Sequence, residues 1–190
     1  ELKIIELNTV DEVCFAIKEM QVRGAPLIGV TAAYGMYIAS KENANIDFLE
    51  KISQRINSTR PTAVNLSWAL SEVMNKIVDL KEDQTSEKIL EIANQIRQDD
   101  IDNCKKIGEY GYELIKNIYE KKNKTVNILT HCNAGWLATI NWGTATSPIY
   151  HAHQRGIPIH VWVDETRPRN QGANLTSYEL NEEGIKNTII

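Results

Sequence analysis

The chain has 190 residues, 42% of them hydrophobic and 24% charged, and a net charge of −4 at neutral pH. This composition is typical of a globular protein with one large domain or two smaller ones, and the acidic balance argues against a general nucleic-acid binder. Three widely spaced cysteines, Cys14, Cys104 and Cys132, form neither a disulfide framework nor a metal-ligand spacing. We therefore expect a reducing, cytoplasmic setting and no metal site.

Residues 1–120 are predicted to form a mostly helical N-terminal domain. Apolar residues recur there at helical spacing in four groups: Val10, Val13, Cys14 and Ile17; Leu49, Ile52 and Ile56; Trp68, Leu70, Val73, Met74, Ile77 and Val78; and Ile89, Ala93, Ile96 and Leu114. The last group belongs to a long helix that we expect to open at Ser86 and Glu87. Cys104 falls inside this helix and is interpreted as a structural residue.

Residues 121–190 are predicted to form the first part of a Rossmann-like α/β domain. Strands are expected at residues 125–129 and 157–163, and a third strand begins at residues 188–190. Helices are expected between them, at residues 137–154 and 175–183. Strands that alternate with helices indicate right-handed crossovers and a parallel, doubly wound sheet. We expect the domain to be truncated after the start of the third strand, so that the chain is part of a longer protein.

Residues 130–135, with the sequence Thr-His-Cys-Asn-Ala-Gly, directly follow the first predicted strand. In open α/β sheets, ligands bind beyond the carboxyl ends of the strands. A thiol held there beside the amides of a helix N-terminus is biased toward the reactive thiolate. Cys132 is therefore the candidate for chemistry, with His131 as a group that could orient it. The alternatives are that Cys132 is a small buried apolar residue and that His131 makes a structural hydrogen bond.

Two loops of the helical part carry an arginine before a predicted helix. Arg23, Gly24 and Ala25 precede a proline, a pattern in which backbone amides and a guanidinium can bind an anion. Arg60 stands in a similar position, with Thr62 as a candidate helix cap. An ordinary turn between helices explains the first loop equally well, and an ordinary capped helix start explains the second better on local grounds.

A third polar loop, residues 164–172, follows the second predicted strand, and we expect it to contribute to a ligand site. No G-x-G-x-x-G fingerprint is present, so we expect no dinucleotide cofactor. His151 and His153 are two residues apart on a predicted helix and therefore do not form a chelating pair.

Four segments taken together resemble the methylthioribose-1-phosphate isomerase family. They are residues 20–26, 59–65, 130–135 and 164–173, and they occur in that family's order over nearly the whole chain. The resemblance implies a small helical domain, a Rossmann-like domain and a homodimer. It also implies conversion of 5-methylthioribose 1-phosphate to 5-methylthioribulose 1-phosphate in methionine salvage, with no cofactor.

By the same resemblance, Cys132 is the catalytic cysteine. Substrate-binding residues are implied at the matching motif positions Arg23, Gly24, Ala25, Arg60 and Gln171. The family's partner acid, an aspartate in a Gly-Ala-Asp-Arg segment, does not occur in these 190 residues. We therefore expect the full-length protein to be active and this segment alone not to be.

Two alternative functions remain open at this point. Residues 143–148 depart from the commonest form of the family, so the substrate could be 5-deoxyribose 1-phosphate or ribose 1,5-bisphosphate. Related proteins are non-catalytic regulatory subunits of the initiation factor 2B complex, which act by binding partners. The presence of Cys132 within its motif favours the isomerase, and the sequence leaves open whether hydrogen moves as a proton or a hydride.

Overall fold

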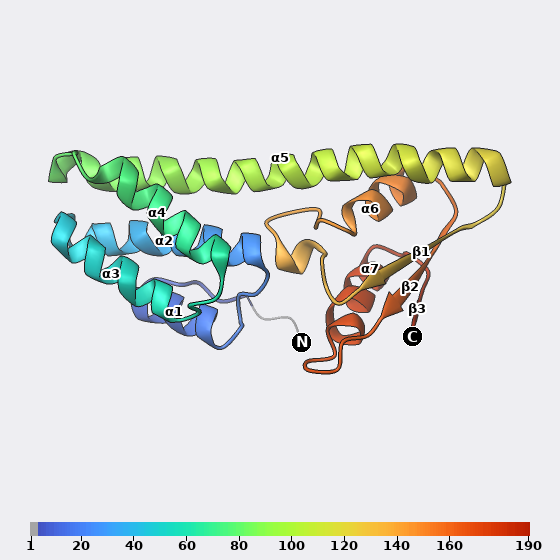
Figure 1. The fold of residues 1–190 in the computed structure, drawn as a ribbon, viewed down its shortest axis with the longest axis horizontal. Coiled ribbons are helices and arrows are strands. Elements are labelled where there is room, and N and C mark those ends of the chain that lie inside the picture. The colour runs from blue at the N-terminus through green and yellow to red at the C-terminus, as the bar shows by residue number, and fades with distance from the viewer. Residues whose placement is uncertain (1–3) are drawn as a thin grey trace. The chain divides into compact units, whose positions relative to one another are not determined.

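The computed structural model describes residues 4–190 and contains two compact units, Glu1–Gln98 and Asp99–Ile190 (Figure 1). Helix α5 (Glu82–Lys122) crosses the boundary and contributes residues to both units. The boundary predicted from the sequence, after residue 120, lies close to the end of this same helix. Helices precede a parallel sheet, which confirms the predicted α/β fold class.

The N-terminal unit is a bundle of α1 (Val10–Lys18), α2 (Ala25–Glu42), α3 (Ile46–Ser58), α4 (Val64–Ile77) and the first part of α5. The first helix starts with a capping box: the Thr9 hydroxyl accepts a hydrogen bond from the backbone N–H of Glu12, and the Glu12 carboxylate accepts one from the backbone N–H of Thr9. The side chain of Asn45 caps α3 by accepting from the backbone amides in the first turn of that helix. The apolar faces of these helices meet in a core that includes Ile17, Met36, Leu49, Leu66 and Ile89.

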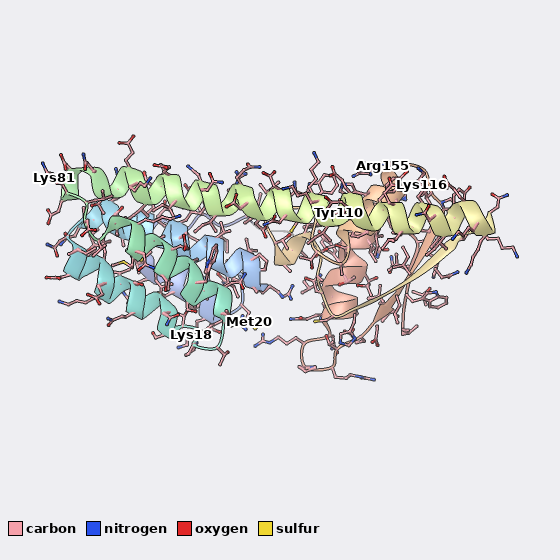
Figure 2. The ribbon with its side chains drawn as sticks, turned by 45° about the horizontal axis from the view of Figure 1, so that its top comes forward. Lys18, Met20, Lys81, Tyr110, Lys116 and Arg155 are labelled. Atoms are coloured by element: carbon pink, nitrogen blue, oxygen red, sulfur yellow. The ribbon has the colours of Figure 1, made fainter. Side chains whose placement is uncertain are left out.

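Most of the periodicity predicted for the helical part is confirmed; the errors are Trp68, which is 49% exposed within α4, and residues at the end of α4 or on α5. Val78 is 58% exposed because α4 ends one residue earlier, and Leu114 is 68% exposed on the outer face of α5. Tyr110, one turn before Leu114, is also exposed on this helix (Figure 2). The prediction that Thr62 caps α4 is wrong, because the N-cap residue is Ala63 and no side chain accepts a capping hydrogen bond there. The long helix begins at Glu82 and not at Ser86.

The C-terminal unit contains a parallel sheet in the order β1 (Val126–His131), β2 (Ile159–Asp164) and β3 (Asn187–Ile189). Its register pairs the last residues of the first two strands, so their carboxyl ends meet at one edge. One face of the sheet is buried against α5, α6 (Ser147–Gln154) and α7 (Tyr178–Glu182). The middle strand, β2, contributes Ile159, Val161 and Val163 to this buried face. The predicted strands are confirmed to within two residues at each end.

The predicted helix over residues 137–154 is wrong for its first half. A 3₁₀ turn, η1 (Trp136–Ala138), is followed by an irregular loop, and only residues 147–154 form α6. Trp142 and Gly143 have φ of 69° and 75°, and this left-handed backbone interrupts a helix. The other predicted helix starts earlier than expected, as the π-helix η2 (Gly172–Ser177), and continues into α7. Within residues 4–190, no helix is long and apolar enough to cross a membrane.

Candidate functional site

The ends of β1 and β2 are joined at the carboxyl edge of the sheet. His131 pairs with Asp164 in the register, and His131 Nδ1 lies 2.6 Å from Asp164 Oδ2. The backbone N–H of Cys132 donates to the carbonyl of Asp164 at 3.2 Å. These two hydrogen bonds therefore hold the start of the polar loop after β1 against the end of β2.

The Cys132 thiol lies at this edge and is half-buried. It donates to Gln171 Oε1 at 3.0 Å, so two predicted site residues that are 39 positions apart in the sequence are in contact. The backbone of Cys132 has a φ of 58°, in the left-handed region that residues other than glycine rarely adopt. Such a conformation persists only where the surroundings hold it.

A buried network holds the residues that follow the thiol, which we call the cysteine loop (residues 132–135). Thr176 Oγ1, from η2, donates to the carbonyl oxygen of Cys132 at 2.6 Å. The Asn133 side-chain amide lies 3.1 Å from Thr176 Oγ1 and donates to Glu179 Oε1 at 3.0 Å. The cysteine loop is thus tied to η2 and to α7, as well as to the sheet.

Glu179 is a fully buried carboxylate that sequence reasoning did not identify. It accepts hydrogen bonds from the Asn133 side chain, the Leu137 amide and the Tyr150 hydroxyl, each at 3.0 Å. Burial raises the pKa of Glu179, although these donors act in the opposite direction. No pattern in the sequence points to Glu179, because its close approach to Gly135, where a Cβ would lie 1.5 Å from Glu179 Oε2, exists only in the folded chain.

A second carboxylate, Glu165, fixes the loop that carries Gln171. Its oxygens accept from the backbone amides of Thr166, Gly172 and Ala173 at 2.7, 2.7 and 2.9 Å. Burial alone would raise the pKa of Glu165, but the three backbone donors lower it below its usual value. The carboxylate therefore stays ionised and ties the end of β2 to the start of η2.

The other predicted site residues lie in the N-terminal unit, at the starts of α2 and α4. Gly24 is the N-cap of α2 with a φ of 87°, Arg23 precedes it and Ala25 is the exposed first residue of the helix. Arg60 is half-buried in the turn before α4.

The two helix starts lie close together. A Cβ added at Gly29, in the second turn of α2, would lie 2.9 Å from the carbonyl oxygen of Asn65, in the first turn of α4. Both helices run the same way within the bundle (Figure 1), so the two arginine loops lie at the same end of the N-terminal unit. Helix N-termini and arginines favour an anion such as a phosphate.

The remaining cysteines lie in less reactive surroundings. Burial, together with the nearby carboxylate of Asp100, raises the pKa of the Cys104 thiol to about 11. Burial also raises the pKa of Cys14. Both thiols stay protonated at neutral pH, which agrees with the structural role predicted for Cys104. In the part of the chain that the structure describes, no cluster of three His, Cys, Asp or Glu side chains could hold a metal.

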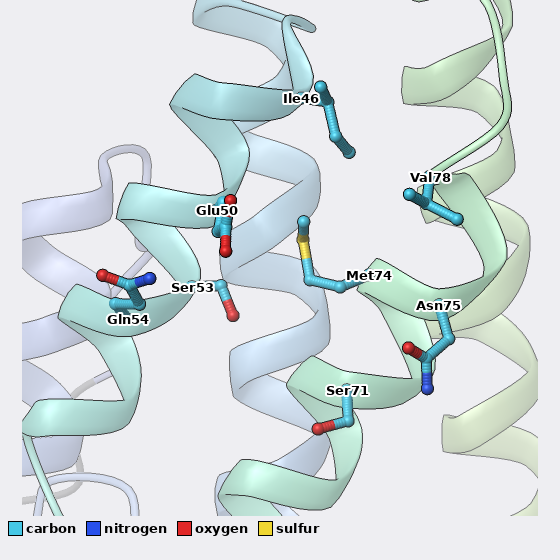
Figure 3. Close-up of a pocket in the computed structure, with 8 residues that line it drawn as sticks. All are labelled: Ile46, Glu50, Ser53, Gln54, Ser71, Met74, Asn75 and Val78. Atoms are coloured by element: carbon cyan, nitrogen blue, oxygen red, sulfur yellow. The ribbon is translucent and has the colours of Figure 1, made fainter.

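A separate groove of about 380 Å³ lies between α3 and α4 in the N-terminal unit (Figure 3). Its walls carry polar groups from both helices, including Glu50, Ser53 and Asn75. None of the predicted site residues lines it. The groove therefore does not bear on the candidate site.

Comparisons with known proteins identify the family and several relatives of this chain. Residues 21–190 match the model of the Initiation factor 2 subunit family. A methylthioribose-1-phosphate isomerase of Methylorubrum extorquens is 50% identical over 190 residues, which cover 100% of this chain and 52% of the relative. The chain spans about half the length of the curated relatives it matches.

Two solved structures are similar along the whole chain. The crystal structure of 5-methylthioribose 1-phosphate isomerase from Pyrococcus horikoshii OT3 has a TM-score of 0.88 at 36% identity, over 100% of this chain and 54% of that one. The crystal structure of the translation initiation factor eIF-2B, subunit delta, from A. fulgidus has a TM-score of 0.83 at 38% identity, over 100% of this chain and 56% of that one.

Proposed function

The chain belongs to the Initiation factor 2 subunit family, and within that family we propose that its full-length protein is an aldose–ketose isomerase. The substrate we propose is 5-methylthioribose 1-phosphate and the product is 5-methylthioribulose 1-phosphate, a step of methionine salvage. The observation that carries this proposal is the Cys132 thiol, fixed at the carboxyl edge of the sheet by Gln171. Relatives of this name, about 50% identical along the chain, support it.

The proposed substrate makes specific demands on the protein. Its phosphate is attached to the anomeric carbon and blocks simple ring opening, so the enzyme has to assist opening and then move a hydrogen from C2 to C1. We assign binding of the substrate, with its phosphate, to Arg23, Gly24, Ala25 and Arg60. Arginines and helix N-termini provide orientation and charge neutralisation for this group.

Within the C-terminal unit, we assign the catalytic role to Cys132 and a substrate contact to Gln171. In this proposal the thiol stabilises the transition state or assists hydrogen transfer, and a tuned acid–base partner completes the proton route. The hydrogen bond from the thiol to Gln171 gives it a defined direction before substrate binds. We also infer a cytoplasmic homodimer, as the resemblance of the sequence motifs to the isomerase family implies.

A non-catalytic role, as a regulatory subunit of a translation initiation exchange factor, is the main alternative. The similarity to the A. fulgidus subunit delta structure favours it. However, a subunit that acts only by binding partners has no need of a thiol held in a left-handed loop and directed at Gln171. The isomerase is therefore the better supported reading.

The test is an assay of the full-length protein with three substrates. Ketose formation is followed from 5-methylthioribose 1-phosphate, 5-deoxyribose 1-phosphate and ribose 1,5-bisphosphate. The first two differ only by a small apolar tail, which a pocket discriminates weakly, whereas the third carries a charged phosphate in its place. We expect Cys132→Ser to lower kcat by about 100-fold or more, the range of a lost acid–base group. Cys14→Ser is the matched control and should keep the wild-type rate. Wild-type turnover in Cys132→Ser would remove the catalytic assignment, and no ketose from any substrate would favour the regulatory role.

A further inference from the structure

We propose that Glu179 is a positioning residue for Cys132 and holds the cysteine loop in the conformation that presents the thiol to substrate. This inference rests on the proposed isomerase function. Glu179 itself is fully buried beneath the loop and does not reach the surface, so it acts through other residues and not on the substrate.

The first support is the position of the hydrogen bonds along the chain. Glu179 Oε1 accepts from the side chain of Asn133, the residue after the thiol, and from the amide of Leu137, just beyond the loop. One oxygen atom therefore bonds a residue of the cysteine loop and a residue of η1, the turn that follows the loop. Tyr150 donates to the other oxygen and fixes the carboxylate from the side of α6.

The second support is a short relay from the carboxylate to the backbone of Cys132. Asn133 lies within hydrogen-bond distance of both Glu179 and Thr176, and Thr176 donates to the Cys132 carbonyl. The left-handed φ of Cys132 needs such an external constraint. Without the carboxylate, the Asn133 side chain loses one of its buried acceptors and the Leu137 amide loses its partner, so the loop is free to relax.

The third support is the space that Gly135 leaves. Its φ of −96° and ψ of −166° are extended values that any residue can adopt, so backbone conformation does not require a glycine. A Cβ at this position would instead lie 1.5 Å from Glu179 Oε2 and 2.4 Å from Cδ. Gly135 is therefore the place where the loop makes room for the carboxylate.

The experiment compares Glu179→Ala with Glu179→Gln in the full-length protein. Gln keeps an oxygen that can accept from Asn133 and Leu137, whereas Ala removes it. We expect Glu179→Ala to lower kcat by about 10- to 100-fold, the scale of a misplaced catalytic group, with KM changed less than about threefold. Glu179→Gln should restore kcat to within about threefold of wild type, the residual cost of changing one acceptor oxygen to a donor.

Leu180→Ala is the matched control for lost stability. Leu180 is the neighbouring residue on α7, is fully buried in the sheet core, and its apolar side chain takes no part in the hydrogen bonds that hold the loop. It should lower the melting temperature by at least as much as Glu179→Ala but leave the kcat of the folded protein unchanged. Equal losses of kcat in both variants would overturn the inference, as would a wild-type kcat in Glu179→Ala.

A double variant tests the close approach at Gly135. Gly135→Ala displaces the carboxylate and should lower kcat as Glu179→Ala does. When both substitutions are combined, the new methyl group enters the space that the carboxylate has left, so the double variant should be no worse than Glu179→Ala alone. Additive losses would contradict a shared mechanism.

Alkylation of Cys132 by iodoacetamide, quantified by peptide mass spectrometry, provides a readout that does not depend on turnover. We expect Glu179→Ala to change the Cys132 alkylation rate by about threefold or more, a range typical of modest changes in thiol access, and Glu179→Gln and Leu180→Ala not to. If the wild type forms no ketose but the alkylation pattern holds, the proposed function fails and the positioning role stands. If the alkylation rates are equal, the positioning role fails whatever the activity.

Discussion

Glu165 and Glu179 each hold one of the two segments that meet at the thiol, and their surroundings shift their pKa values in opposite directions. Glu165 bonds three backbone amides at the end of β2, which lower its pKa. Glu179 is sealed beneath the cysteine loop, where burial raises its pKa. One carboxylate therefore anchors the segment with Gln171, and the other supports the segment with Cys132.

The lowered pKa of Glu165 predicts a pH-dependent contribution to stability. Because its folded value lies below the ordinary 4.5, the ionised carboxylate stabilises the fold above that pH, and this contribution is lost as the pH falls through the folded value. Glu165→Gln should therefore lower the melting temperature most at pH 7, and the difference from wild type should shrink below pH 4.5.

Thermal melts from pH 7 to pH 3 measure this difference. Glu182→Gln, an exposed substitution on α7, is the matched control and should leave the melting temperature close to wild type throughout. A deficit for Glu165→Gln that stays constant down to pH 3 would rule out the ionised clamp.

At the level of single residues, only part of the candidate site could be predicted from the sequence. Cys132 and Gln171 belong to motifs that sequence comparison finds, and the structure places them in contact. Glu179 lies 46 positions from Asn133 in an ordinary-looking helical segment. Its importance comes from a long-range approach to Gly135, and spacing along the chain does not encode such an approach.

At the level of elements, the start of α2 depends on its close packing against α4. An alanine in a helix interior normally stabilises it by about 1 kcal/mol relative to glycine. At Gly29 the added methyl would lie 2.9 Å from the Asn65 carbonyl, so the helix starts have to separate. Under the proposed function, Gly29→Ala should raise KM for the sugar phosphate several-fold, because Arg23 and Arg60 move apart.

Gly35→Ala is the control for this prediction. Its methyl group would meet the side chains of Val13 and Ile56, farther along α2 and away from the arginine loops. We expect both alanine variants to lower the melting temperature, but only Gly29→Ala to raise KM in steady-state kinetics of the full-length protein. Matching KM values in the two variants would show that the helix starts do not position the phosphate ligands.

Strands were predicted more accurately than helices because their sequence pattern is local. Buried runs such as Ile159–Asp164 carry their own apolar periodicity. The expected helix over residues 137–154 fails where Trp142 and Gly143 adopt a left-handed backbone. The loop that contains this turn is held in part by a distant segment: the Ile140 amide donates to Asp100 Oδ2, 40 positions away, at 2.8 Å. Hydrophobic periodicity in one window contains no information about such contacts.

At the level of the whole molecule, the chain combines two units that carry different parts of the proposed chemistry. The arginines lie in Glu1–Gln98, and the thiol lies in Asp99–Ile190. The 190 residues span about half of the relatives that they match, and they contain no Gly-Ala-Asp-Arg segment of the kind that supplies the partner acid. Under the proposed function, a proton route through Cys132 needs an acid–base partner, and the family resemblance implies one in such a segment.

The 190-residue chain by itself should therefore be a poor catalyst even when it is folded. We expect its kcat/KM for 5-methylthioribose 1-phosphate to be about 100-fold or more below that of the full-length protein, since an acid–base partner contributes at least this much. Circular dichroism of both proteins establishes that the comparison is between folded samples, and Cys132 alkylation reports whether the cysteine loop is formed in each. Equal kcat/KM values would mean that the catalytic groups all lie within these residues, and His131 with Asp164, 2.6 Å apart at the same edge of the sheet, would then become the acid–base pair to test.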